Sequence, residues 1–568
     1  MKKLFLLQIT LLVLLPALVA AVFDTEDTDD GPRFLEFNYT GCDAVYRENP
    51  LDSTNFYNPI LQGFYPDPSL TRKGDDYYMV CSSFAYFPGV PIFHSTDLVN
   101  WTQIGNVLSR PSQLKLDGLD IKCGIYAPVI RYNPYNDTFY MITTLVGGLH
   151  GGNFLVKAKD PAGEWSDPVW LPQVGGIDPS LFFDDNGKAY IVHNAAPNGK
   201  PLYPGHRTIR MWEFDVQTDK VVSGGDVVIN GGVDIRDKPI WIEGPHMYKK
   251  NGTYYIMCAE GGTDERHSEV IFSSDKVGGR YKPAEKNPIL TQRHLDENRP
   301  YPVTCSGHAD IISTPEGDYY AVFLACRPYA GDKYNTGRET FILPVDWSGK
   351  FPLFKGGLEP IRPTLPLPKG VVYKAGKSGY FPNGNFIYIE KFRGDRPDPR
   401  WIAIRGAYDD FAKTGKNGLE LTPLPVDITE QATPAFIGYR QQHLNFKLRT
   451  VMEYTPHCEN DLAGVVCYQN EGFNYVLGVT VSDGVKKVVL EKTLDGKTEC
   501  IAEVLLPGQY SRVTLAVDGR GRSYNFGYSA DGCDIEWISH DQDGSLLSTA
   551  VAGGFTGCIL GLYTTSGR

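Results

Sequence analysis

The sequence predicts an all-β protein in which a five-bladed β-propeller is followed by a C-terminal β-sandwich. Three observations lead to this prediction. A unit that ends in a tyrosine-containing strand occurs five times between residues 58 and 347. Asp-Gly turns between short apolar strands replace this unit in the last part of the chain. Neither part contains a long segment with helical periodicity, so we expect strands throughout.

Each copy of the repeated unit consists of a head residue, a polar turn and a strand that carries a tyrosine about a dozen residues after the head. The five heads are Asp67, Ala127, Asp178, Glu243 and His308, and their tyrosines are Tyr78, Tyr140, Tyr190, Tyr255 and Tyr320. An interval of about 50 to 65 residues is typical of propeller blades built from four antiparallel strands. If every head lies at the same place on the innermost strand of its blade, the four polar heads meet at one mouth of the central channel.

The chain divides into five predicted segments. They are a signal peptide at residues 1–21, a lead-in at 22–55, the propeller at 56–350, a proline-rich linker at 351–368 and the sandwich at 369–568. Lys2 and Lys3 precede an apolar run that ends near Ala20 and Ala21, which is the pattern of a secretory signal with a small-residue cleavage site. We therefore expect an exported protein, either periplasmic or secreted.

The last segment is marked by hairpin turns. Asp483-Gly484, Asp495-Gly496, Asp518-Gly519 and Asp531-Gly532 stand at or between short apolar strands. Regular hairpins over about 200 residues are typical of a β-sandwich.

Length and charge limit the possible functions. A chain of 568 residues exceeds what one hydrophobic core serves, so two domains are expected. The net charge of −12 argues against nucleic acid or an anionic membrane as a partner. No stretch after the predicted signal peptide is apolar enough to span a membrane. A neutral ligand fits better, and the abundant aromatic residues suit the faces of sugar rings; the oligomeric state stays open.

Three carboxylates that converge at one axis need a chemical reason, because crowded carboxylates repel one another and are costly to bury. Glycoside hydrolysis supplies one, since a general acid protonates the departing oxygen while a second carboxylate activates water. The third carboxylate can raise the pKa of the acid. Taken singly, Asp67 and Asp178 could be turn residues in Asp-Pro-Ser, and His308 could be an interior histidine with satisfied hydrogen bonds.

Nine short motifs stand in a fixed order along the chain. Seven lie in the predicted propeller, at residues 58–69, 84–91, 94–98, 243–246, 259–263, 307–310 and 337–340, and two lie in the predicted sandwich, at 440–443 and 470–477. FAYFPGVP, EGPH and GRET are among them. This series resembles glycoside hydrolase family 43, and most of all its β-xylosidase and α-L-arabinofuranosidase members.

The resemblance implies roles for individual residues. Asp67 would be the general base, Glu243 the general acid, and Asp178 the residue that raises the pKa of the acid and helps to position it. Substrate-binding roles are implied for Phe84, Tyr126, Thr263, His308, Arg338 and Phe555. His308 would lie near the axis, where relatives hold a water or a calcium ion, so it is also the candidate metal ligand. No cofactor is required, although a structural calcium ion near the axis is compatible with the family.

The resemblance further implies an exo-acting, inverting enzyme that releases terminal β-1,4-linked D-xylose from xylan fragments of the plant cell wall. The alternative is an α-L-arabinofuranosidase, or an enzyme that accepts both sugars. Tyr126 stands where close xylosidase relatives carry tryptophan, which puts the sugar preference in doubt. The final strand that is usual in the family is also missing after Arg568.

Two other classes of function compete with this interpretation. A non-catalytic carbohydrate-binding propeller would keep aromatic platforms without needing an intact acid and base. A metal-dependent or serine hydrolase would need a motif such as H-E-x-x-H or G-x-S-x-G, and the sequence contains neither.

Overall fold

The computed structural model describes residues 31–148, 151–530, 532 and 534–567. The predicted signal peptide lies outside the described residues. Strands dominate the described part, and its helices are two short α-helices, α1 (Ala44–Glu48) and α2 (Thr549–Ala552), and three single 3-10 turns, η1 (Ile235–Asp237), η2 (Tyr408–Asp410) and η3 (Gly544–Leu547). None of these helices has the length and hydropathy of a membrane-spanning segment.

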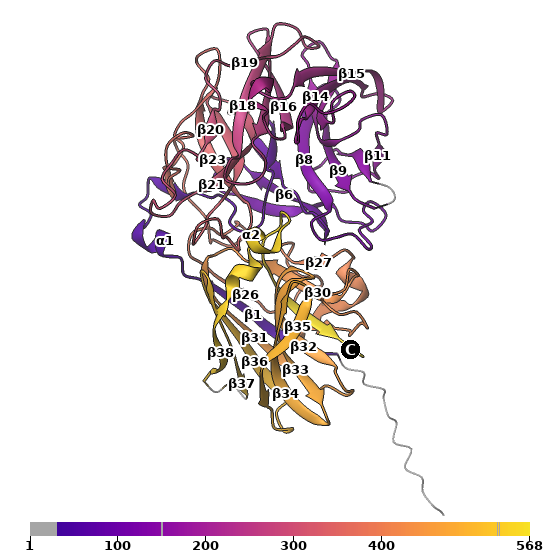
Figure 1. The fold of residues 1–568 in the computed structure, drawn as a ribbon, viewed down its shortest axis with the longest axis vertical. Coiled ribbons are helices and arrows are strands. Elements are labelled where there is room, and N and C mark those ends of the chain that lie inside the picture. The colour runs from indigo at the N-terminus through magenta and orange to yellow at the C-terminus, as the bar shows by residue number, and fades with distance from the viewer. Residues whose placement is uncertain (1–30, 149–150, 531, 533, 568) are drawn as a thin grey trace, which may run out of the picture. The chain divides into compact units, whose positions relative to one another are not determined.

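Five antiparallel blades form the propeller, four of them with four strands and blade 4 with a fifth short strand, so the predicted blade count is confirmed. Figure 1 shows the propeller in indigo to salmon above the sandwich. In each blade the first strand in the chain is the innermost one. Blade 1 contains β3 (Ser69–Lys73), β4 (Asp76–Val80), β6 (Gly89–Ser95) and β7 (Thr102–Leu108). Blade 2 contains β8 (Gly124–Asn133), β9 (Thr138–Val146), β10 (Gly152–Ala158) and β11 (Val169–Trp170).

The other three blades follow in chain order. Blade 3 contains β12 (Ile177–Phe183), β13 (Ala189–Ala195), β14 (Thr208–Asp215) and β15 (Lys220–Asn230). Blade 4 contains β16 (Glu243–Lys250), β17 (Thr253–Glu260), β18 (Ser268–Ser274) and β19 (Lys282–Pro283), with β20 (Leu290–Thr291) also paired to β18. Blade 5 contains β21 (Thr304–Ser313), β22 (Tyr319–Cys326), β23 (Glu339–Asp346) and β24 (Leu353–Phe354). The innermost strands contact one another in ring order, which closes the circle.

The innermost strands share a bulge with a left-handed residue. The register slips by one residue at this point in blades 2 to 5, and the bond from Ser82 N to Pro66 O marks the same slip in blade 1. The left-handed residues, with φ between 40° and 55°, are Asp67, Ala127, Asp178, Gly244 and His308. Such a backbone costs about 1–3 kcal/mol for a residue other than glycine and is found most often at functional sites.

The polar heads were predicted to occupy the same position on the innermost strand of every blade. This prediction is wrong by one residue in blade 4. Gly244 holds the bulge position there, and Glu243 is the residue before it. A Cβ atom at position 244 would lie only 2.7 Å from Nε2 of His308. Blade 4 therefore needs glycine at the bulge, and its carboxylate comes from the preceding position.

The chain segment before blade 1 fastens the ring to blade 5. Ile60 donates its backbone N–H to Thr340 on β23, and the Asn58 side chain bonds both polar groups of the Ile342 backbone. Just before this segment, β2 (Asn55–Tyr57) pairs with β25 (Thr364–Pro366). The proline-rich segment 351–368, predicted to be a linker, thus supplies β24 to blade 5 as well as β25.

Two eight-stranded sheets form the C-terminal sandwich, which confirms the predicted fold class. One sheet contains β1 (Arg33–Gly41), β26 (Ile387–Glu390), β28 (Ala412–Gly415), β29 (Gly418–Leu421), β31 (Asn445–Glu453), β36 (Arg512–Arg520), β37 (Ser523–Ala530) and β38 (Glu536–Asp543). The other contains β5 (Tyr86–Phe87), β27 (Ile402–Ile404), β30 (Ala435–Arg440), β32 (Leu462–Asn470), β33 (Phe473–Ser482), β34 (Val485–Leu494), β35 (Lys497–Leu505) and β39 (Ile559–Thr565).

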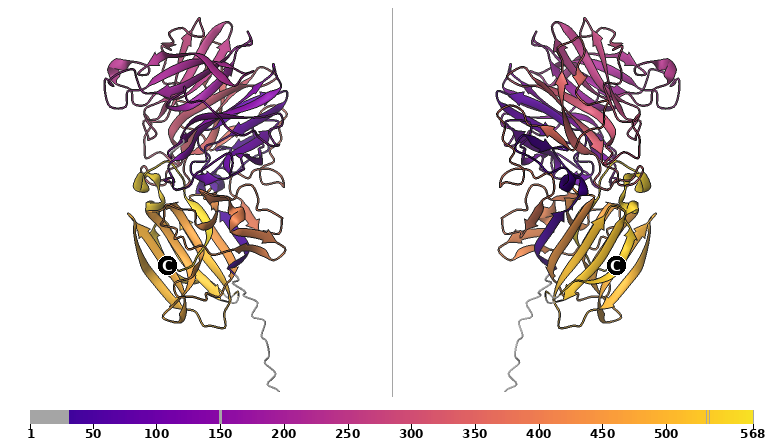
Figure 2. Two further views of the ribbon diagram at one scale, coloured as in Figure 1. Left: turned by 90° about the vertical axis from the view of Figure 1, so that its right-hand side faces the viewer. Right: turned by 90° about the vertical axis from the view of Figure 1, so that its left-hand side faces the viewer.

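Two strands in this sandwich come from distant parts of the chain. Strand β1 belongs to the segment that sequence reasoning treated as a lead-in, and it pairs with β31 over most of its length. Figures 1 and 2 show this indigo strand among the orange strands of the C-terminal region. Strand β5 follows blade 1 and pairs with β27. Both connections hold the sandwich against the propeller.

Two of the four predicted hairpin turns are confirmed, and the Asp531-Gly532 prediction stays untested because residue 531 lies outside the described residues. Asp483-Gly484 joins β33 to β34, and Asp495-Gly496 joins β34 to β35, each with φ above +50° at both residues as a type I′ turn requires. The Asp518-Gly519 prediction is wrong, because both residues lie within β36. A Cβ atom on Gly519 would meet the Phe446 ring at 2.4 Å, so this glycine serves close packing instead of a turn.

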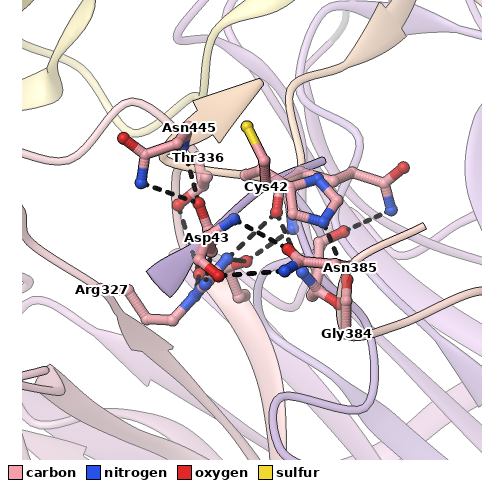
Figure 3. A network of polar contacts seen from close by, with 12 residues as sticks. Cys42, Asp43, Arg327, Thr336, Gly384, Asn385 and Asn445 are labelled. Atoms are coloured by element: carbon pink, nitrogen blue, oxygen red, sulfur yellow. Dashed lines mark hydrogen bonds and ion pairs between the residues drawn. The ribbon is translucent and has the colours of Figure 1, made fainter. Parts of the chain in front are cut away.

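A buried polar network joins the two domains (Figure 3). Arg327, at the end of β22, donates two hydrogen bonds of 2.6 and 2.9 Å to Glu339 and one of 3.0 Å to Asp43, which follows β1. Asp43 also accepts a hydrogen bond from the Asn445 backbone at 2.7 Å. Glu339 directly follows Arg338, which lines the cavity at the mouth of the propeller channel, so the network fixes the segment that carries Arg338.

Replacing Arg327 by methionine should lower the free energy of unfolding by about 3–5 kcal/mol, because two buried carboxylates lose their cation. Chemical denaturation measures this change. Arg522→Met is the matched control, since Arg522 pairs with Asp543 on the surface, where such pairs contribute about 0–1 kcal/mol. Equal effects of the two substitutions would contradict a structural role for the buried network.

Candidate active site

One cavity of about 320 Å³ lies at the mouth of the propeller channel. All nine residues predicted for the site line it: Asp67, Phe84, Tyr126, Asp178, Glu243, Thr263, His308, Arg338 and Phe555. Four further residues complete the lining: Ala127, Ile177, Trp241 and Gly262. This volume suits a small ligand that is largely enclosed by protein.

Asp67 is held as a carboxylate. Its Oδ2 accepts a hydrogen bond of 2.6 Å from Ser82, and its Oδ1 lies 3.1 Å from Nη1 of Arg338 and 3.5 Å from Nδ1 of His308. Burial alone would raise the pKa of Asp67, but the positive charge of Arg338, together with His308 and the Ser82 bond, outweighs burial and lowers this pKa. Asp67 is therefore ionised at neutral pH and able to accept a proton.

Glu243 is held as an acid. It is the first residue of β16 and is partly buried in the cavity wall. Desolvation raises the pKa of Glu243 well above its ordinary value, and the negative charges of Asp178 and Asp67 raise it further. The carboxyl group consequently keeps its proton at a pH where Asp67 has lost one.

Asp178 connects these two groups. Its Oδ2 accepts a hydrogen bond of 3.1 Å from the backbone N–H of Gly244, next to Glu243, and its own backbone N–H donates to Oγ1 of Thr144 at 3.1 Å. Burial raises the pKa of Asp178, and the charge on Asp67 adds to the shift. Asp178 is thus placed both to fix the backbone beside Glu243 and to repel a negative charge on it.

Replacing Asp178 by asparagine should move the alkaline limb of the kcat/KM profile to lower pH. The amide oxygen can still accept the Gly244 bond, but the negative charge that raises the pKa of Glu243 is lost. Desolvation remains, so this pKa should stay above its ordinary value. A pH profile between pH 4 and 10 measures the shift, and an unchanged alkaline limb would show that Asp178 does not act on the acid electrostatically.

Aromatic rings form one wall of the cavity. Phe84 lies with its centroid 4.8 Å from that of Tyr126 and 6.2 Å from that of Phe555, and the Arg338 guanidinium lies 5.7 Å from the centroids of both phenylalanines. Phe555 reaches this wall from the sandwich. Its segment is held by the bond from Cys558 N to the carbonyl of Asn335, at 2.8 Å. The cavity therefore needs both domains.

The described side chains around His308 do not form a calcium site by themselves. Calcium takes six to eight oxygen ligands. The carboxylate beside His308 belongs to Asp67, which already binds Arg338 and Ser82. Across the described residues, no group of three or more His, Cys, Asp or Glu side chains could hold a metal ion. His308 instead contacts the Asp67 carboxylate.

Sequence reasoning missed Trp241. Its indole is 37% exposed and lines the cavity two residues before Glu243. The available signal was an aromatic residue in the apolar run that leads to a glutamate at the start of a strand. That signal alone does not distinguish a packed core residue from a cavity residue.

The chain matches two protein-family models. Residues 56–351 match the model described as glycosyl hydrolases family 43, and residues 389–568 match the beta xylosidase C-terminal concanavalin A-like domain. A xylosidase/arabinosidase of Butyrivibrio fibrisolvens is 38% identical over 515 residues, covering 90% of this chain and 95% of that protein. A non-reducing end alpha-L-arabinofuranosidase of Bacteroides ovatus is 35% identical, covering 91% and 92%.

Solved structures share the fold. The crystal structure of a GH43_12 protein retrieved from a capybara gut metagenome superposes with a TM-score of 0.90 at 52% sequence identity, covering 94% of this chain and 99% of that one.

Proposed function

Since this chain belongs to glycosyl hydrolase family 43 and is a glycosidase for xylan-type carbohydrates, we propose that it is an exo-acting, inverting enzyme that removes single terminal pentoses. The substrates would be fragments of xylan or arabinoxylan. Asp67 would act as the general base, Glu243 as the general acid, and Asp178 as the residue that tunes and positions the acid.

One observation carries this proposal: Asp67 and Glu243 line one small cavity in opposite electrostatic surroundings, since Arg338 and Ser82 contact Asp67 and the carboxyl group of Asp178 lies near Glu243. Arg338 and Ser82 favour the charged form of Asp67, whereas desolvation and neighbouring charges favour the neutral form of Glu243. Glycoside hydrolysis needs such a pair, one group to activate water and one to protonate the leaving oxygen. A carbohydrate-binding propeller without activity would have no need of it.

We propose that the cavity accepts both β-1,4-linked D-xylose and α-L-arabinofuranose. Xylose is the first candidate because of the motifs shared with β-xylosidases. Arabinofuranose is the second candidate, and two observations favour it. Tyr126 presents a smaller ring than the tryptophan expected of xylosidases, and the two relatives named above carry arabinosidase activity in their names.

The test compares kcat/KM on aryl β-D-xylopyranoside and aryl α-L-arabinofuranoside, with Asp67→Ala as the inactive control. Comparable values would support dual specificity, and a clear preference for one sugar would replace it by a single activity. Proton NMR of the first product formed distinguishes inversion from retention. If the wild type turned over neither substrate, the proposed activity would be wrong.

We also propose that the protein is exported, on the strength of its basic and apolar N-terminal pattern. Cell fractionation with an antibody against the sandwich, combined with mass spectrometry of the mature N-terminus, tests this. A full-length chain confined to the cytoplasm would contradict the proposal.

A further inference from the structure

Trp241 projects a partly exposed indole into the cavity from the side of the acid. It lies between β15 of blade 3 and β16 of blade 4. The cluster of aromatic rings and Arg338 comes from blades 1, 2 and 5 and from the sandwich. In the ring order of five blades, blades 3 and 4 lie opposite blade 1, so the cavity has aromatic surface on two opposing sides.

The backbone of Trp241 is strained and firmly held. Its φ of +50° belongs to the left-handed region, which a bulky side chain rarely adopts. Trp241 N–H donates to the Gly205 carbonyl at 3.0 Å, and Gly261 N–H donates to the Ile240 carbonyl at 2.9 Å. Strain that is held in this way marks ligand clamps more often than ordinary packing.

Arg207 stacks on the indole and also lies near the carboxyl groups of Glu243 and Asp178. Its guanidinium carbon lies 4.4 Å from the centre of the Trp241 ring, and two of its nitrogens donate to Oδ1 of Asn194 at 3.0 and 2.6 Å. Asn194 in turn donates to the carbonyl of Ile242, between the tryptophan and the acid. Arg207 and Asn194 therefore fix the short segment that carries both Trp241 and Glu243.

The chemistry of inversion decides which part of the substrate lies on this side. The acid must reach the glycosidic oxygen, and water must attack from the opposite face of the sugar. The leaving group therefore departs beside Glu243, and the terminal sugar lies toward Asp67, Arg338 and the aromatic wall.

We propose that Trp241 is the binding platform for the leaving-group sugar, the ring directly attached to the terminal pentose, and that Arg207 is its positioning residue. The ligand class is a neutral pyranose ring that stacks on the exposed part of the indole. This inference rests on the proposed function, because it takes Glu243 as the acid. Binding energy at this remote ring would be gained in the ground state and kept in the transition state, so it would favour oligosaccharides over simple glycosides in kcat/KM.

The kinetic test uses two substrates that differ only in the leaving-group ring: a disaccharide with a terminal pentose, and the methyl glycoside of the same pentose. Both leaving groups are poor alkoxides that need protonation by the acid. Trp241→Ala should lower kcat/KM for the disaccharide about tenfold or more, and for the methyl glycoside about twofold or less.

Trp241→Phe should restore part of the loss, and Arg207→Met should raise KM for the disaccharide more than it lowers kcat. Trp170→Ala, at a tryptophan of similar exposure on β11, is the control and should change neither value.

A binding test separates this inference from the proposed activity. In the Asp67→Ala background, calorimetry compares the affinity of the disaccharide with that of the free pentose, with and without Trp241→Ala. Loss of the extra affinity for the disaccharide alone would support the platform even if the wild type proved inactive. Equal losses for both ligands or both substrates would overturn it, because Trp241 would then act only by holding the cavity together.

Discussion

Replacing Asp67 by asparagine should lower kcat by about 10²- to 10⁴-fold on every substrate, whatever the leaving group. Asparagine keeps the size of the side chain and an oxygen that accepts the Ser82 hydrogen bond, but it cannot accept a proton from water. Because the activated water attacks in the same step in which the leaving group departs, an activated aryl glycoside should not rescue the variant. Initial rates on a disaccharide and on a dinitrophenyl glycoside measure this.

The matched control is Asp184→Asn. Asp184 is fully buried and is bound by Lys249 and Tyr254, but it does not line the cavity. The Asp184→Asn variant should fold and keep the wild-type kcat. An Asp67→Asn enzyme with wild-type rates would show that another group activates the water.

Replacing Glu243 by glutamine should produce a loss that depends on the leaving group. Disaccharide hydrolysis should fall about 10²- to 10⁴-fold, because the departing alkoxide no longer receives a proton. A dinitrophenyl glycoside should lose only about tenfold or less, since its leaving group departs without protonation. Rates on the two substrates, measured at several pH values, separate this pattern from a general loss of folding.

The pH dependence provides a second signature. Wild-type activity should fall as the pH rises through the raised pKa of Glu243, because the acid then loses its proton. The glutamine variant cannot titrate, so its residual activity on the dinitrophenyl glycoside should lack this alkaline limb. Glu260→Gln is the control, since burial also raises the pKa of Glu260 although it lies outside the cavity. Loss of the limb in both variants would contradict the assignment of the acid.

The polar heads of the candidate site were predictable because they occupy a repeated position in the chain, whereas Phe84, Tyr126, Thr263 and Arg338 were expected only through the family resemblance. Asp67, Asp178 and His308 stand at the same bulge in three blades, and a period in the sequence becomes a ring in space. The motif identified Glu243, but the repeat predicted this residue at the bulge position of blade 4, which Gly244 occupies. The collision of a side chain at position 244 with His308 involves two strands that are distant in sequence, and no local pattern reveals it.

The positions of Phe555, Trp241 and β1 could not be predicted from local sequence, because they depend on contacts with distant parts of the chain. Phe555 was expected over the pocket only through the family resemblance, since nothing near it in the chain indicates which domain it faces. Trp241 looked like part of an apolar run, although its backbone turns the indole into the cavity. Strand β1 was unplaced because its partner, β31, lies about four hundred residues away in the chain.

The all-β class, the five blades, the sandwich and two of its type I′ turns follow from the sequence, because strand period and turn chemistry depend on neighbouring residues. The bulge residue of blade 4, the need for glycine at position 519 and the different protonation of Asp67 and Glu243 follow only from the folded chain. These features depend on burial, steric collisions and charges that come from residues far away in the chain. Those contacts form only when the blades and the sandwich fold together.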